Sequence, residues 1–115
     1  MSKIVKIMSI KSIKNQIFYG SRSRFIEYTN RLSETAKNQK GFISSNSYWK
    51  NNLNTHEVCE FQIVSISNWN RLDDWNNWLK SKERKEVSDR FKEIKCDEKF
   101  DILLKKKNND DIFLL

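Results

Sequence analysis

Three tryptophans, Trp69, Trp75 and Trp78, lie within ten residues of otherwise polar sequence. On a helix, where successive residues are about 100° apart, Trp69 would share one stripe with Leu72 and Leu79, and Trp78 would lie roughly opposite. Such a helix carries more aromatic surface than one core-facing side requires. The surplus could line a ligand cavity, contact a second subunit or complete a core.

Few other side chains suggest chemistry. His56 is the only histidine, which excludes a metal site built on two histidines and allows a Ser-His-Asp triad only around this residue. Cys59 and Cys96 have no CxxC spacing, so we expect buried free thiols rather than zinc ligands. No glycine-rich phosphate loop is present. We therefore expect no bound metal or other cofactor.

The composition fits one folded domain with an aromatic-rich core, because 115 residues include 37% hydrophobic and 12% aromatic residues. The net charge of +7 arises in the first 40 residues, which contain nine Lys or Arg and only two acidic residues. This field could steer an anionic ligand or nucleic acid, although a solvated lysine-rich surface is the simpler interpretation. No apolar run approaches the ~20 residues of a spanning helix, and no signal peptide is recognisable. We expect a cytoplasmic protein.

The first half of the chain has clear periodic patterns. Alternating apolar residues predict a strand over residues 3–13, and a helix is expected over about residues 22–39, with Gly41 as its left-handed stop. The inward stripe of this helix is Phe25, Thr29, Leu32 and Ala36. Residues 42–50 and 57–66 then predict a hairpin.

The second hairpin strand has apolar residues on both sides. Cys59, Phe61 and Ile63 face one way and Val58, Val64 and Ile66 the other. Glu60 and Gln62 interrupt the second set, which suggests a cavity, an intersubunit contact or simple exposure.

Ser67 or Asn68 is expected to cap the tryptophan-bearing helix, which should bend near Ser81. A last strand is expected over residues 97–105. The resulting order βαββαβ predicts an α+β, ferredoxin-like fold with strand order 4-1-3-2, in which Cys59 and Cys96 are not neighbours.

We expect one domain over residues 1–105. Residues 106–115 form a tail that ends in four apolar residues, and it could dock on its own subunit, extend to a partner as a dimer arm, or be disordered.

The segment DWNNWLKSKERKE resembles the helix signature of the antibiotic biosynthesis monooxygenase-like family of dimeric α/β barrels. The matching residues are Trp75, Trp78, Leu79, Ser81, Glu83 and Arg84, together with Gly41-Phe42 at the start of the second strand. The resemblance covers residues 3–105. It implies a homodimer of face-to-face sheets, with a pocket between the sheet and the helices of each protomer.

Some members of this family oxygenate polycyclic aromatic substrates without metal or flavin, because a deprotonated substrate can give an electron to oxygen. The resemblance therefore implies a cofactor-independent, monooxygenase-like oxidoreductase that acts on an aromatic or polycyclic substrate. Trp78, Trp75 and Tyr48 would line its pocket, and His56 or Arg84 would offer a proton or a positive charge. Such a pocket must stabilise an anion and exclude water.

A second branch of the family degrades haem with an Asn on the first strand, a Trp in the helix and a His further on. Trp78 matches the tryptophan, but Ser88 stands at the histidine position and the first strand has no Asn before Asn15. We therefore do not expect haem degradation.

Two other functions fit the sequence. The scarcity of titratable groups favours a non-catalytic ligand-binding or dimerisation domain on the same scaffold. RNA binding is a lesser alternative, because the RNA-recognition fold shares the βαββαβ order and Lys40-Gly41-Phe42 opens like its signature. That signature lies on the third strand of the fold, however, and the match ends after three residues.

Overall fold

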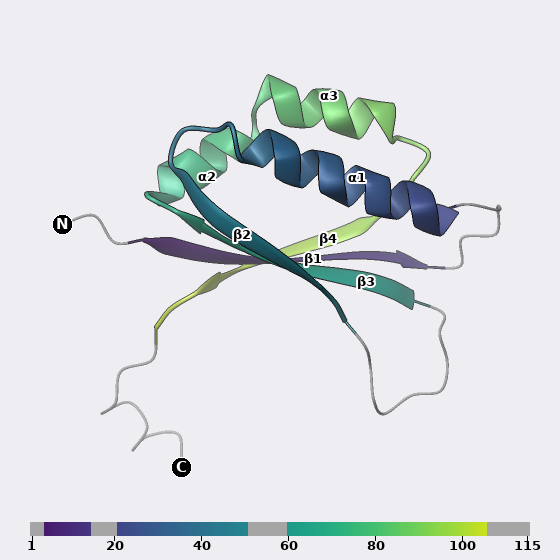
Figure 1. Ribbon diagram of the computed structural model, residues 1–115, viewed down its shortest axis with the longest axis horizontal. Coiled ribbons are helices and arrows are strands. Elements are labelled where there is room, and N and C mark those ends of the chain that lie inside the picture. The colour runs from purple at the N-terminus through teal and green to yellow at the C-terminus, as the bar shows by residue number, and fades with distance from the viewer. Residues whose placement is uncertain (1–3, 15–20, 51–59, 106–115) are drawn as a thin grey trace, which may run out of the picture.

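The computed structural model describes residues 4–14, 21–50 and 60–105 of the chain. Its elements are β1 (Val5–Lys14), α1 (Ser21–Ala36), β2 (Phe42–Trp49), β3 (Glu60–Trp69), α2 (Leu72–Leu79), α3 (Lys82–Arg90) and β4 (Asp97–Leu103). The three helices lie on one side of a single sheet, and no described element covers the other side, which we call the open face (Figure 1).

The sheet is antiparallel throughout and has the order β2-β3-β1-β4. This order confirms the expected ferredoxin-like α+β fold. Alternate residues of β1 point toward the helices, so that Ile7 and Ile13 are buried at 1% and 4% exposure. Lys6 and Met8 point toward the open face.

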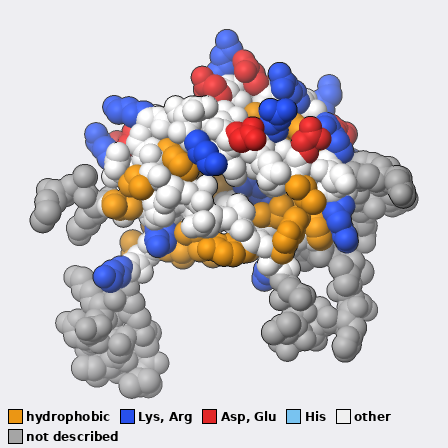
Figure 2. Space-filling model, viewed as in Figure 1, with side chains coloured by type: hydrophobic (Ala, Val, Ile, Leu, Met, Phe, Trp, Pro, Cys, Tyr) orange, Lys and Arg blue, Asp and Glu red, His pale blue; other side chains and the backbone are white. Residues whose placement is uncertain are grey.

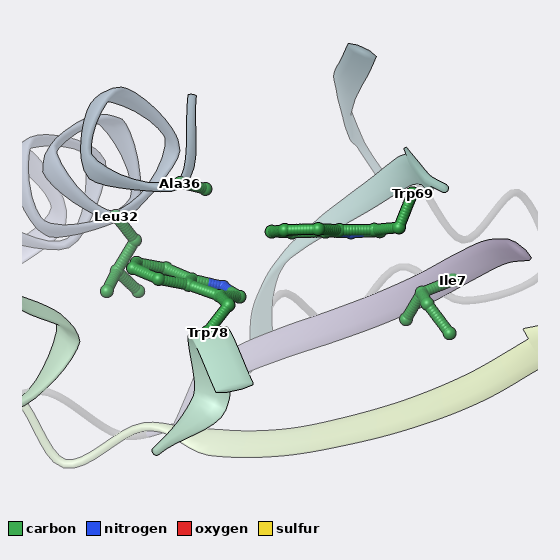
Figure 3. Packing of buried hydrophobic residues seen from close by; sticks show 5 residues of the cluster. All are labelled: Ile7, Leu32, Ala36, Trp69 and Trp78. Atoms are coloured by element: carbon green, nitrogen blue, oxygen red, sulfur yellow. The ribbon is translucent and has the colours of Figure 1, made fainter. Parts of the chain in front are cut away.

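The core between sheet and helices has two clusters of buried side chains. One contains Ile7, Leu32, Ala36, Trp69 and Trp78, and Figure 3 shows its two indole rings lying between the strands and α1. The other contains Ile13, Phe25, Ile63, Phe91 and Ile94. Full burial of such side chains stabilises the fold by roughly 1.5–3 kcal/mol each, so the two clusters hold the helices on the sheet.

α1 has the predicted inward stripe: Phe25, Thr29, Leu32 and Ala36 are all buried. The helix ends near the predicted stop, where Gly41 has a φ of 84°, a conformation that favours glycine. A Cβ at Gly41 would overlap the buried carboxyl group of Asp74 on α2. Gly41 therefore allows the chain to reverse in close contact with α2.

The expected start of the tryptophan-bearing helix is wrong, because Trp69 is the last residue of β3 and α2 begins only at Leu72. Ser67 does not cap a helix. Trp69 and Ser67 lie on the same side of β3, where the Trp69 indole Nε1–H donates to Ser67 Oγ at 3.0 Å. The residue before α2, Arg71, makes no side-chain cap. The strand alternation that includes Ile63 continues through Trp69, so these residues extend the strand instead of starting a helix at Ser67 or Asn68.

The bend predicted near Ser81 is a complete break between α2 and α3. Ser81 caps α3, since its Oγ accepts a hydrogen bond from the backbone N–H of Arg84 at 3.1 Å. Its hydroxyl donates to the carbonyl of Trp78 at 2.8 Å, which holds the two helices together. β4 ends at Leu103, two residues earlier than expected.

Several expectations concern residues that the structure does not describe, namely the tail at 106–115, His56 and Cys59. Cys96 is a free thiol. Within the described ranges, no helix is long and apolar enough to cross a membrane.

Candidate functional site

A cavity of about 60 Å³ lies between the sheet and the helices. It has room for a few water molecules, since a cavity needs roughly 10–15 Å³ to hold one water molecule. Hydroxyl groups in its wall come from Ser9, Thr29, Ser33, Ser45, Ser65 and Ser67. Aromatic rings come from Phe42, Trp69, Trp75, Trp78 and Phe100, and the charged side chains in the wall are Lys11 and Arg84.

The cavity exists because serines occupy the middle of the helix-facing side of the sheet. Ser9 on β1 stands opposite Ser65 on β3, and Ser67 stands opposite Ser45 on β2. Ile7 precedes this row on β1 and is fully buried. Because a serine side chain is much smaller than the isoleucine or tryptophan beside it, the sheet surface is hollow under the helices at this point.

Two tryptophans from α2 close the cavity on the helix side. Trp78 is 7% exposed and packs with Leu32 and Ala36 of α1, as Figure 3 shows. Trp75 meets Phe100 of β4 edge to face, with ring centroids 5.2 Å apart. The guanidinium of Arg84 lies 5.9 Å from the Trp78 ring, within range of a cation–π interaction.

Lys11, Arg84 and Glu98 form a partly buried ionic cluster beside the cavity. The register of β1 and β4 places Lys11 directly opposite Glu98, and Lys11 Nζ lies 3.2 Å from Glu98 Oε2. Arg84 reaches the other carboxylate oxygen, Oε1, at 2.7 Å. Lys11 Nζ also donates to Ser9 Oγ at 2.8 Å. Two cations thus share one carboxylate.

Two weakly acidic groups near this cluster are held neutral. Burial raises the pKa of the Cys96 thiol from 9.0 to about 11, and the negative charge of Glu98 adds to the shift. Burial also raises the pKa of Tyr28, although a hydrogen bond with Ser88 and the charge of Arg84 act in the opposite direction. At neutral pH Cys96 is therefore a thiol and Tyr28 a phenol, and neither is a ready nucleophile or base.

The structure brings together Trp75, Trp78 and Arg84, three of the residues predicted from the sequence, in one cavity wall. Tyr48 lies elsewhere, because it points to the open face opposite Val64 and is 55% exposed. A register shift between Phe42 and Ser44 explains this orientation. An extra residue there exchanges the two faces for the rest of β2, so that Phe42 and Tyr48 point in opposite directions.

Sequence reasoning missed Lys11, Glu98 and the serines of the cavity floor. A usable signal was present in β1, where Ser9 and Lys11 continue the inward-facing positions of Ile7 and Ile13. A charged residue in such a row needs a buried partner. Among the described residues, no group of three His, Cys, Asp or Glu side chains could hold a metal ion.

Comparison with solved structures gives the same fold. A mutant form of SnoaB of Streptomyces nogalater, a cofactor-independent oxygenase, is 11% identical with a TM-score of 0.62, over 90% of this chain and 95% of that chain. A proposed antibiotic biosynthesis monooxygenase from Nitrosomonas europaea is 11% identical with a TM-score of 0.63, over 94% and 95% of the two chains. A dimeric ferredoxin-like protein of unknown function from a Jannaschia species is 8% identical with a TM-score of 0.59, over 86% and 99%.

No protein-family model matches the sequence, and no curated protein matches it. The comparisons therefore rest on structure. They agree with the resemblance to the antibiotic biosynthesis monooxygenase-like family at the level of the fold. Because folds host many chemistries, the function has to be argued from the cavity.

Proposed function

We propose that the protein is a small oxidoreductase that oxygenates an aromatic substrate without a resident cofactor, in the cavity between the sheet and the helices. The observation that carries this proposal is the joint position of Trp75, Trp78 and Arg84 in the cavity wall. The indole rings offer apolar surface to an aromatic substrate, and the guanidinium offers a positive charge. The fold shared with the oxygenase SnoaB supports the same reaction class.

In this reaction class the substrate is first deprotonated, and its anion then gives an electron to oxygen. The site therefore has to stabilise negative charge and keep out water. Arg84 suits the first requirement, and the buried Trp78 suits the second. His56, the other candidate for offering a proton or a positive charge, lies outside the described residues.

The size of the cavity sets a condition on this proposal. A cavity that held benzene measured on the order of 150 Å³, well above the about 60 Å³ observed here. An aromatic ring therefore needs a larger cavity, which a change of rotamer at Trp75 or Trp78 or a movement of α2 would provide.

Oxygen uptake tests the proposal. We expect the purified protein to consume oxygen with anthrone or a quinol as substrate, and Trp78→Phe to lower turnover by about tenfold through poorer substrate positioning. Trp49→Phe is the matched control, because Trp49 lies outside the cavity wall and should leave turnover unchanged. No turnover by the wild type, or equal turnover in the two variants, would contradict the proposal.

A second candidate is a ligand-binding domain without catalysis. It is favoured by the small cavity and by the described part of its wall, which includes no Asp, Glu or His side chain that could act as a base. Quenching of tryptophan fluorescence by aromatic metabolites, with no oxygen uptake and no product, would support this candidate over the oxygenase.

The same proposal includes a homodimer formed through the open face. Figure 2 shows hydrophobic side chains along the lower edge of the molecule, on the sheet side, whereas charges gather over the helices. The register places apolar side chains of the central strands on the open face, namely Met8, Ile10, Val64 and Ile66. The Jannaschia protein of this fold is dimeric.

A further inference from the structure

The cavity wall carries positively charged side chains in addition to its aromatic rings. Lys11 and Arg84 are its charged lining residues, and Glu98, the carboxylate they share, is not part of the wall. The side chains of Lys11 and Arg84 are only 11% and 17% exposed. Two cations that share one carboxylate leave this cluster with a net positive charge, and both cations line the cavity.

Two serine hydroxyls of the cavity wall can donate a hydrogen bond to a ligand. Ser9 Oγ accepts from Lys11 Nζ, and Ser67 Oγ accepts from the Trp69 indole N–H. A serine hydroxyl that already accepts a hydrogen bond still has its own hydrogen to donate. Thr29 differs, because its hydroxyl donates to the carbonyl of Ile26 and offers only an acceptor to the cavity.

We propose that Lys11, with Ser9 and Arg84, forms a binding site for the anionic oxygen of a small carboxylate or enolate ligand. This inference rests on the proposed function only in taking the cavity as the substrate site. A negatively charged group would receive N–H and O–H donors together with the net positive charge of the cluster, in surroundings where water screens little. The cavity of about 60 Å³ suits a group the size of a carboxylate, so the anionic end of the ligand enters first.

Glu98 competes with an anionic ligand for Lys11. Its Oε2 lies 3.2 Å from Lys11 but makes no well-aligned hydrogen bond within the described residues, whereas Oε1 is held by Arg84 at 2.7 Å. An incoming anion therefore competes with Glu98 for Lys11. Glu98 lowers the affinity for anions and keeps the cations together while the site is empty.

Binding of acetate, with acetamide as its neutral isostere, tests the site. We expect acetate to shift the indole N–H signals of Trp75 and Trp78 in two-dimensional NMR spectra, and acetamide to bind at least about tenfold more weakly. Lys11→Met should weaken acetate binding by about tenfold and leave acetamide unchanged. Glu98→Gln should tighten acetate binding, because it removes the competing carboxylate.

The opposite signs of these two variants separate a charge effect from a loss of structure. Lys85→Met is the matched control, because it removes one positive charge from an exposed position on α3. If Lys11→Met fails to fold, Lys11→Arg, which keeps the charge, and Glu98→Gln decide the question. Equal binding of acetate and acetamide, or weakening by both Lys11→Met and Glu98→Gln, would overturn the proposal.

The outcome is independent of turnover. Acetate binding with the expected pattern and no oxygen uptake would refute the oxygenase and leave the anion site standing. Oxygen uptake that Lys11→Met and Lys85→Met affect equally, without acetate binding, would refute the anion site and leave the oxygenase standing.

Discussion

Lys11 shows how one side chain decides the character of the cavity. It lies on a strand whose other inward positions are apolar or small, and it is buried because Glu98 and Ser9 satisfy its charge and one of its donors. A buried cation without such a partner would carry a large desolvation penalty. The sequence places Lys11 on the inward side of β1, but the identity of its partner depends on the pairing of β1 with β4.

Cys96 offers a prediction at the scale of one residue. In a Cys59→Ser background, Cys96 should react with a thiol reagent about a hundredfold more slowly at pH 8 in the folded protein than in the denatured protein. The reason is that its pKa is raised from 9.0 to about 11, which reduces the fraction of thiolate. Equal rates in the two states would contradict the assigned environment.

The same shift gives Cys96 a pH-dependent effect on stability. A thiol with a raised pKa in the folded state stabilises the fold below its unfolded pKa of 9.0, and this contribution is lost as the pH rises through about 11. The free energy of unfolding should therefore fall more steeply between pH 9 and 11 in the parent than in Cys96→Ala. Parallel pH profiles for the two would contradict this linkage.

At the scale of elements, periodicity predicted most of the fold. The inward stripe of α1, the stop at Gly41 and the interruption of the helix near Ser81 depend on local sequence, and all three are confirmed. Trp69 and Tyr48 were misplaced because their positions depend on strand pairing. β3 continues to Trp69 where it pairs with Val5, and the register shift in β2 turns Tyr48 to the open face.

Gly41→Ala should destabilise the protein by about 2–3 kcal/mol. A left-handed conformation costs alanine roughly 1–2 kcal/mol, and the added Cβ would overlap Asp74. Chemical denaturation of Gly41→Ala, alone and in an Asp74→Gly background that removes every overlapping side-chain atom, separates the two parts. In that background the cost of Gly41→Ala should drop to the conformational part alone, and an unchanged cost would show that the contact with Asp74 is unimportant.

At the scale of the whole molecule, the two sides of the sheet differ in what covers them. The helix-facing side holds the core and the cavity, whereas the open face carries apolar side chains that no described element covers. The composition of the strands predicted two partly apolar sides. The family resemblance implied a pocket between the sheet and the helices, but the serines that form it were not predictable, because they belong to three strands that come together only in the sheet.

A charge on the open face tests the proposed homodimer. Ile66→Lys should convert a dimer to a monomer in sedimentation equilibrium, because it puts an unpaired charge into an apolar interface. Lys82→Glu on α3, which changes charge on the helix side, should leave the assembly unchanged. A wild-type monomer at micromolar concentration, or an Ile66→Lys dimer, would contradict the interface.

The central claim is that the cavity between the sheet and the helices is where this protein binds its substrate. Heteronuclear NMR of the tryptophan indole N–H groups during titration with anthrone or a quinol tests it most directly. Trp75 and Trp78 line the cavity, whereas Trp49 lies outside it at 51% exposure. We predict shifts for Trp75 and Trp78 with Trp49 unchanged; a shift of Trp49 alone, or no shift at saturating ligand, would contradict the claim.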